Sequence, residues 1–209
     1  MLCFSSCGTD DLDDPVKKAP EPKASDYYPL KAGNYWVYEL YETHPDSAES
    51  YRVYQGRDSI HVVGAKVFGN DTFYQVSYNS AFLNKSNEYK YYKDSAGYLI
   101  EKQGIKKLSI DNFTDTLYSY NITGSDKENF AYVRRYMEKY DGTLQTPSGI
   151  FDSIINLKQR VHTNNPNLFP NYPRYNSNLY AKGIGKVYYD FGYLGGRAIT
   201  ECTLVKYKV

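Results

Sequence analysis

The chain is poor in cysteine and has no long apolar stretch. Only three of its 209 residues are cysteine, and their spacing fits neither a zinc site nor an iron–sulfur cluster. A domain of this length buries enough surface to fold without disulfide bonds. No run of about eighteen apolar residues occurs, so no segment predicts a membrane-spanning helix. We therefore predict no metal and no cofactor, and we interpret Cys202 as a small apolar packing residue.

The common catalytic motifs are also missing. His44, His61 and His162 are far apart, and neither a nucleophile elbow nor an active-site Ser–Lys set occurs. The run Gly183–Lys186 is not a phosphate-binding loop, because Tyr180 stands where its first glycine is required. We interpret these glycines as a strand bulge or a close backbone approach. The sequence does not indicate an enzyme, although a triad of distant residues is recognised only by its geometry.

Charge of either sign is close to balance, with 25 basic and 24 acidic residues. Residues 1–26 are acidic overall, and the remainder carries a small, dispersed positive excess. This pattern is too weak for a nucleic-acid footprint, so we predict no nucleic-acid partner. We interpret the pairs Lys106-Lys107 and Arg134-Arg135 as solvated faces.

Tyrosine is abundant, with 25 Tyr against 9 Phe and 1 Trp. Tyrosine favours strands, because its ring packs on a half-buried pleated surface while the hydroxyl stays wet. The composition predicts an antiparallel sheet with one solvated face. The alternative is a stacking surface for sugars or other flat ligands.

Alternation of apolar residues predicts strands along most of the chain. The clearest is Asn34–Tyr41, in which Trp36, Tyr38 and Leu40 share one face, and we predict that Trp36 anchors the core. Further strands are predicted at Tyr51–Gln55 and Asp58–Val63 with a break at Gly56, and at Thr72–Tyr78, Glu88–Lys93, Tyr98–Glu101, Ile105–Ile110, Thr116–Ile122, Ile150–Val161, Leu179–Phe191 and Ala198–Val209.

The segment 126–141 fits two structures. A capping box at Ser125–Glu128 and apolar residues at helical spacing fit a helix, but the same residues also alternate. We favour a strand because the neighbouring segments are β. The predicted fold is all-β: a single domain over residues 27–209 with a mostly antiparallel curved sheet, a half-barrel or a sandwich, leaving room for one short helix.

The N-terminus resembles that of bacterial lipoproteins. Phe4-Ser5-Ser6-Cys7 is similar to their cleavage box, which implies that residues 1–7 are the remnant of a signal peptide and that Cys7 carries lipid. The acidic run that follows is similar to lipoproteins exported to the surface of some Gram-negative bacteria. Residues 8–26 are rich in Pro and Asp and poor in apolar residues, which predicts a disordered tether. The implied location is the outer membrane or cell surface.

Three further segments resemble lipid-anchored bacterial envelope proteins of unknown function. They are a P-L-x-x-G-x-x-W-x-Y opening at Pro29–Tyr38, a P-x-G-x-F turn at Pro147–Phe151, and an A-x-G-x-G-x-V run at Ala181–Val187. The resemblance implies one β-rich envelope domain, similar to the half-barrel of lipoprotein carriers. It implies no activity.

A tripeptide in which Asp is followed by Ser or Thr, and then by Ala or an aliphatic residue, occurs five times. It resembles the acceptor of an O-glycosylation system in some Gram-negative envelopes, although Asp-Ser is also common turn chemistry. The implied acceptors are Ser47, Ser59, Ser95, Thr116 and Ser153.

The segment 163–178 is predicted to be a long loop, rich in Pro and Asn. Long loops with aromatic residues and arginine are typical of binding sites, and prolines lower the entropy cost of contact. The alternative is a plug over an open end of the sheet. The candidate ligand-binding residues are Leu168, Phe169, Tyr172, Arg174 and Tyr175.

Two functions fit these patterns. The first is a lipid-anchored, non-catalytic binding or accessory protein of the bacterial envelope, whose partner is a glycan, an apolar small molecule or an envelope protein. The second is a hydrolase acting on an envelope polymer or glycan. An enzyme requires a nucleophile or paired carboxylates within about 3 Å of a base, whereas a binding protein requires only an aromatic or apolar concavity.

Overall fold

The computed structural model describes residues 23–44, 51–80, 85–123, 128–164, 172–192 and 196–209. Cys7, Ser47, Leu168, Phe169 and most of the predicted tether lie outside these ranges. Within them, no helix is long and apolar enough to cross a membrane.

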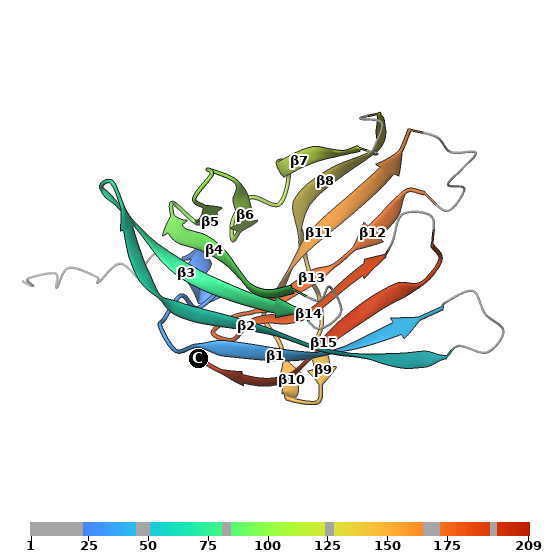
Figure 1. Ribbon diagram of the computed structural model, residues 1–209, viewed down its shortest axis with the longest axis horizontal. Helices are drawn as coiled ribbons and strands as arrows, with labels where there is room; N and C mark the ends of the chain where they lie inside the picture. Colours follow the sequence, from blue (N-terminus) through green and yellow to red (C-terminus); the bar gives the residue numbers. More distant parts are fainter. Residues whose placement is uncertain (1–22, 45–50, 81–84, 124–127, 165–171, 193–195) are drawn as a thin grey trace, which may run out of the picture.

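The described chain is almost entirely β-strand (Figure 1). One 3-10 helix, η1 (Ala24–Asp26), precedes the strands β1 (Tyr35–Thr43), β2 (Arg52–Phe68), β3 (Asp71–Ser80), β4 (Lys85–Ser95), β5 (Tyr98–Glu101), β6 (Lys106–Ser109), β7 (Thr116–Thr123), β8 (Asn129–Lys139), β9 (Leu144–Thr146), β10 (Gly149–Phe151), β11 (Ile154–Thr163), β12 (Arg174–Asn176), β13 (Asn178–Ala181), β14 (Gly185–Gly192) and β15 (Ile199–Lys208).

The strands form one antiparallel sheet in the order β6-β5-β4-β3-β2-β1-β15-β14-β13-β11-β8-β7, with β12 also paired to β11. The first and last strands of the chain therefore meet at the centre of the sheet. The sheet curves until its two edge strands, β6 and β7, lie near each other, and no ladder joins them in the described chain (Figure 1). The short β9–β10 hairpin is a separate two-stranded sheet beside β15. The predicted all-β fold with a curved antiparallel sheet is confirmed, and of the two predicted architectures, a half-barrel and a sandwich, the half-barrel is observed.

β2 is longer than the sequence predicts, because Gly56 does not break it. Gly56 has φ of +124° and lies at a register shift opposite Leu40 and Tyr41. An extra residue on one strand forms a bulge, which bends the strand without ending it. The prediction of two strands separated at Gly56 is therefore wrong.

Two long strands predicted in the C-terminal half are each divided by a turn. The first separates into β10 and β11 at Ser153, which has a left-handed φ of 49°. The second separates into β13 and β14 at Lys182-Gly183, where Gly183 has φ of +75°. The predictions of one continuous strand at Ile150–Val161 and one at Leu179–Phe191 are therefore wrong at these turns.

The ambiguous segment is strand β8, as favoured from the sequence. β8 pairs with β7 on one side and β11 on the other, and its alternate residues Ala131, Val133 and Met137 are buried. Pairing on both sides outweighs the local helical signals. No α-helix occurs in the described ranges.

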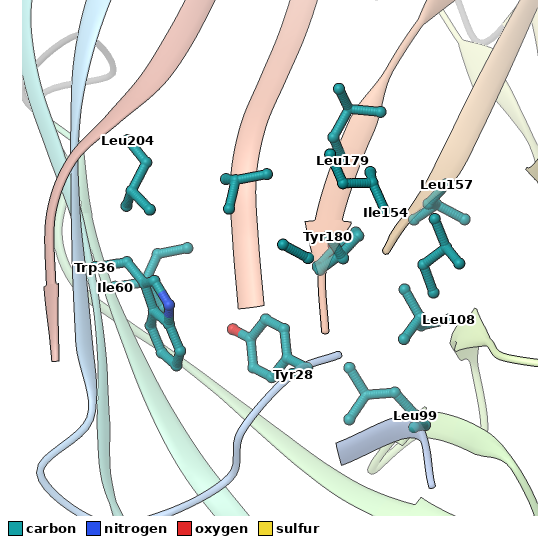
Figure 2. Packing of buried hydrophobic residues seen from close by; sticks show 14 of the residues in the cluster. Tyr28, Trp36, Ile60, Leu99, Leu108, Ile154, Leu157, Leu179, Tyr180 and Leu204 are labelled. Carbon is teal, nitrogen blue, oxygen red and sulfur yellow. The ribbon is translucent and has the colours of Figure 1, made fainter. Parts of the chain in front are cut away.

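The core lies on the concave side of the sheet around Trp36. Trp36 is 1% exposed, and Tyr38 and Leu40 are fully buried, so the predicted buried face of β1 is confirmed. The Tyr28 ring lies between Trp36 and Tyr180, with centroids 5.6 and 6.1 Å away (Figure 2). The N-terminal segment therefore crosses the concave side and packs against both halves of the sheet.

Packing begins ahead of the predicted domain start at residue 27. Ala24 of η1 is fully buried, the Ser25 amide donates to Asp94 Oδ2 at 2.6 Å, and the Asp26 carbonyl accepts from the Gly183 amide at 2.6 Å. The last residues of the expected tether, 23–26, are thus part of the folded domain.

Candidate functional site

Two neighbouring cavities, which share part of their lining, lie on the concave side of the sheet. The central cavity has a volume of about 340 Å³ and is lined by strands from both halves, β3 to β6 on one side and β8 and β11 to β14 on the other. The adjoining cavity has a volume of about 480 Å³ and lies toward β2 and β3. Both volumes fall in the range of about 300–1,000 Å³ that is usual for small-molecule sites. The residues that line both cavities are Tyr78, Lys90, Arg135, Lys186, Tyr189 and Phe191.

Tyrosine hydroxyls form a chain along one wall of the central cavity. The hydroxyls of Tyr28 and Tyr78 lie 3.0 Å apart, and Tyr78 donates to the Tyr92 hydroxyl at 3.0 Å. Burial raises the pKa of all three well above its ordinary value, so they remain neutral. The wall combines aromatic surface with fixed polar groups, which favours the stacking surface considered from the composition.

Four cations line the central cavity, each from a different strand: Lys90 of β4, Lys107 of β6, Arg135 of β8 and Lys186 of β14. Successive residues of a strand point to opposite faces, so one member of a basic pair can be solvated while the other lies inside. Lys106 and Arg134 are exposed, as predicted for these pairs.

The prediction that both members of each basic pair are solvated is therefore wrong for Lys107 and Arg135. The side chain of Lys107 is 20% exposed and bonds to Glu101 at 2.7 Å. Arg135 is on the same face of β8 as the buried Val133 and Met137. Alternation counted from those apolar neighbours would have placed this arginine inside.

A bulge in β14 brings Lys186 into the cavity. The register between β13 and β14 shifts so that Tyr180 pairs with Lys186 and Leu179 with Tyr188. The extra residue changes the phase of the strand, so that Lys186 and Tyr189, three positions apart, line the same cavity. Sequence reasoning rejected a phosphate loop here, and it did not identify Lys186 as a site residue.

The pKa of Lys186 is lowered to about 7, chiefly by burial and also by the positive charges of Arg135, Lys90 and Lys107. Its Nζ donates to Asn178 Oδ1 at 3.0 Å and lies 4.7 Å from the centre of the Tyr189 ring. A lysine in this environment loses its proton near neutral pH, because burial disfavours its charged form.

Asp190 of β14 is an acid in the lining of the central cavity. Burial raises its pKa to about 6, against the opposing effect of a hydrogen bond from the Ser177 amide to Oδ1 at 3.0 Å. The Asp190 amide donates back to the Ser177 carbonyl at 3.0 Å. These two bonds fix Ser177, which lies between β12 and β13, against β14, so Asp190 also stabilises the local structure.

The predicted ligand-binding residues Tyr172, Arg174 and Tyr175 do not line either cavity. The predicted loop is shorter than 163–178, because Arg174–Asn176 is strand β12 and Asn178 begins β13. Tyr172 packs against a small cluster that includes Val133, and the Arg174 guanidinium lies 5.4 Å from the Tyr172 ring centre. Tyr175 is 48% exposed.

The predicted glycosylation acceptors lie in different settings. Ser153 is exposed in the β10–β11 turn, and Thr116 is exposed at the start of β7, where its Oγ1 accepts from Arg134 Nη2 at 3.0 Å. Ser59 and Ser95 are half-buried within β2 and at the end of β4. Ser153 and Thr116 are therefore the exposed members of these four.

The cavity holds few groups suited to catalysis. Asp190 is the only carboxylate among the described residues that line the central cavity, and no described histidine lines either cavity. Across the described ranges, no group of three or more His, Cys, Asp and Glu could hold a metal ion. Cys202 is fully buried, and burial raises the pKa of its thiol to about 12. The adjoining cavity adds the carboxylates of Asp58 and Glu88 to its lining.

The fold and the cavity define a single antiparallel half-barrel domain with a tyrosine-lined, cationic hollow. No protein-family model matches this chain, and no curated protein matches it. A proposed exported protein with a YmcC-like fold from Bacteroides fragilis is similar in structure, with a TM-score of 0.49, 14% identity, and coverage of 86% of this chain and 97% of that chain. A proposed lipoprotein from Parabacteroides distasonis is also similar, with a TM-score of 0.43, 13% identity, and coverage of 86% and 96%.

Proposed function

We propose that the protein is a lipid-anchored, non-catalytic binding protein of the outer membrane or cell surface of a Gram-negative bacterium, and that it holds a small ligand in the central cavity. The observation that carries this proposal is the cavity itself. Both halves of the sheet contribute to its lining, and it combines five tyrosines and Phe191 with hydroxyl, amide and cationic groups. Apolar walls with a few convergent polar groups are typical of small-molecule sites.

The anchor rests on the sequence around Cys7. An apolar residue, two small residues and a cysteine precede an acidic, apolar-poor segment, and the folded domain follows. A tether of this composition would let the domain stand clear of the membrane surface.

A neutral fluorescent probe tests the cavity. N-phenyl-1-naphthylamine should bind the purified domain with an increase in fluorescence. Asn176→Trp should reduce this binding at least about tenfold, because residue 176 lines the central cavity and the larger ring fills it. Asn121→Trp adds the same bulk at an exposed position of β7 and should leave binding unchanged. Equal binding by all three proteins would place the probe elsewhere and contradict the proposal.

Mass spectrometry tests the anchor. Protein extracted from membranes of the native host after expression of the full-length gene should begin at a lipid-modified Cys7. Cys7→Ser should release the protein from the membrane fraction, whereas Cys3→Ser should not. An unmodified Cys7 thiol in soluble protein would refute the anchor and leave the cavity proposal untouched.

A further inference from the structure

Arg135 and Lys186 both line the two cavities, and both have neutral hydrogen-bond partners. Arg135 Nε donates to Gln159 Oε1 at 3.0 Å, and Lys186 Nζ donates to Asn178 Oδ1 at 3.0 Å. Within the described chain, no carboxylate lies within ion-pair distance of either cation. A cation that faces a partly dehydrated space without a counter-charge is unfavourable, so the pair leaves an uncompensated positive potential in the cavity.

The other two cavity cations already have acidic partners. Lys90 lies 3.4 Å from Glu88, and Lys107 lies 2.7 Å from Glu101. Lys90 and Lys107 are thus compensated by close carboxylates, and the uncompensated positive charge of the cavity lies at Arg135 and Lys186.

We propose that the central cavity binds an organic acid, whose anionic group contacts Arg135 and Lys186 and whose apolar or ring-shaped body packs against Tyr180, Tyr189 and Phe191. This inference rests on the proposed function and names its ligand class. An anion would offset the repulsion among the cations, and the guanidinium can bind a carboxylate or phosphate through two hydrogen bonds. A neutral ligand would leave that repulsion in place.

Two sources share this chemistry, a fatty acid and a sugar acid. Decanoate and glucuronate represent them, and decanol and glucose are their uncharged counterparts. Each compound is titrated against wild-type protein carrying bound 8-anilinonaphthalene-1-sulfonate, and its displacement of that anionic probe is followed by fluorescence. We expect at least one acid to displace the probe at a concentration about tenfold or more below that of its neutral counterpart. Which acid does so identifies the source.

Variants locate the anionic group. Arg135→Gln and Lys186→Gln should each weaken binding of the active acid about tenfold or more and leave binding of neutral N-phenyl-1-naphthylamine unchanged. Lys206→Gln removes the same charge from an exposed position of β15 and should change neither affinity. Arg135→Lys keeps the charge and should recover part of the affinity, which separates a loss of charge from a loss of folding.

A pH series adds a second measurement. The groups that face Lys186 are Arg135, Lys90, Lys107, Asp190, Cys202 and Tyr189. Asp190, whose pKa is about 6, is largely ionised above pH 7, so between pH 7 and 8.5 the main titrating member is Lys186, whose pKa is about 7. Affinity for the acid should therefore fall over this interval in wild-type protein and stay level in Lys186→Gln.

The outcomes separate the two proposals. The acid site would be overturned if neutral and acidic compounds bound equally well. It would also be overturned if acid binding were unchanged in both Arg135→Gln and Lys186→Gln. In either case the cavity would remain a binding site. Failure of every compound, including N-phenyl-1-naphthylamine, would overturn the proposed function and this inference together.

Discussion

The indole Nε1 of Trp36 donates a hydrogen bond of 2.7 Å to the main-chain oxygen of Ile184, which lies 148 positions further along the chain. The contact requires a glycine at the next position. A Cβ on Gly185 would lie 2.8 Å from Nε1, and Gly185 has φ of +107°. The tryptophan of the opening segment and the second glycine of the A-x-G-x-G-x-V run are therefore two sides of one contact.

Gly185→Ala should lower the free energy of unfolding by about 2–4 kcal/mol, because it combines a left-handed backbone with overpacking against a buried ring. Chemical denaturation measures the loss. Gly64→Ala is the matched control, since its Cβ would meet nothing within 4 Å and its φ lies outside the left-handed region. Equal effects at the two positions would show that the close approach to Trp36 is unimportant.

Trp36→Ala should cost about 3–5 kcal/mol, as expected for removal of a fully buried ring. The ring also donates the only hydrogen bond described for its Nε1, to Ile184. Thermal and urea unfolding both report the change. A loss below about 1 kcal/mol would mean that neighbouring tyrosines refill the space.

Asp190→Asn should change the pH dependence of stability. The pKa of Asp190 in the folded state is about 6, raised from an ordinary value of 3.8. Between pH 3.8 and pH 6 the folded protein therefore keeps the proton on Asp190, whereas the unfolded protein has released it. The free energy of unfolding of wild-type protein should therefore fall as pH rises from about 4 to about 6. The variant lacks this fall and should be about 1–2 kcal/mol more stable at pH 7, while its amide oxygen still accepts from the Ser177 amide. A less stable variant at pH 7 would show that the negative charge is needed there.

Deletion of residues 8–22 should leave the thermal midpoint unchanged within error. Extending the deletion to residue 26 should lower the midpoint by roughly 4–8 °C, since it removes buried Ala24 and the hydrogen bond between Asp26 and Gly183. Differential scanning calorimetry compares the two deletions. Equal midpoints would mean that η1 contributes nothing to stability.

Tyr172→Ser should lower stability by about 2–3 kcal/mol, because the ring packs against a buried cluster. Tyr175→Ser should change it by less than about 1 kcal/mol, because Tyr175 is 48% exposed beside Lys158 and Arg160. A pull-down with an envelope fraction measures how much of each variant is retained. If Tyr175→Ser is no longer retained although its stability is unchanged, the result would support a binding role for the predicted loop. Unchanged retention would limit this segment to packing.

Much of the fold could be predicted from alternation. Trp36, Tyr38 and Leu40 identify the buried face of β1 because side chains on a strand repeat every two residues. Features that depend on distant pairing could not be predicted in this way. Gly56 forms a bulge only because β1 lies beside it, and β8 is a strand only because β7 and β11 flank it.

The site was harder to predict than the fold. Its cations come from four strands, no two of which are neighbours in the sheet, and only the curvature of the sheet brings them around one cavity. Arg135 was accessible to prediction, since it is in phase with the buried Val133 and Met137. Lys186 was not, because the bulge in β14 shifts the phase of the strand, and the glycines of Gly183–Lys186 suggested a bulge or a close approach without showing which side chains it would turn inward.

The ladder between β1 and β15 also determines how the molecule can assemble. Tyr35 pairs with Lys208 at one end and Thr43 with Ile199 at the other, so the central ladder joins the two ends of the folded chain. The hairpins on either side of the central ladder join segments that are close in sequence, so they can form early. The central ladder joins the two ends of the domain, and its formation costs the entropy of closing the whole chain between them. Folding should therefore take roughly milliseconds to seconds, as in other proteins of high contact order. Trp36 lies on this ladder, so the recovery of its fluorescence after dilution from denaturant should follow the joining of the two halves rather than the formation of either one.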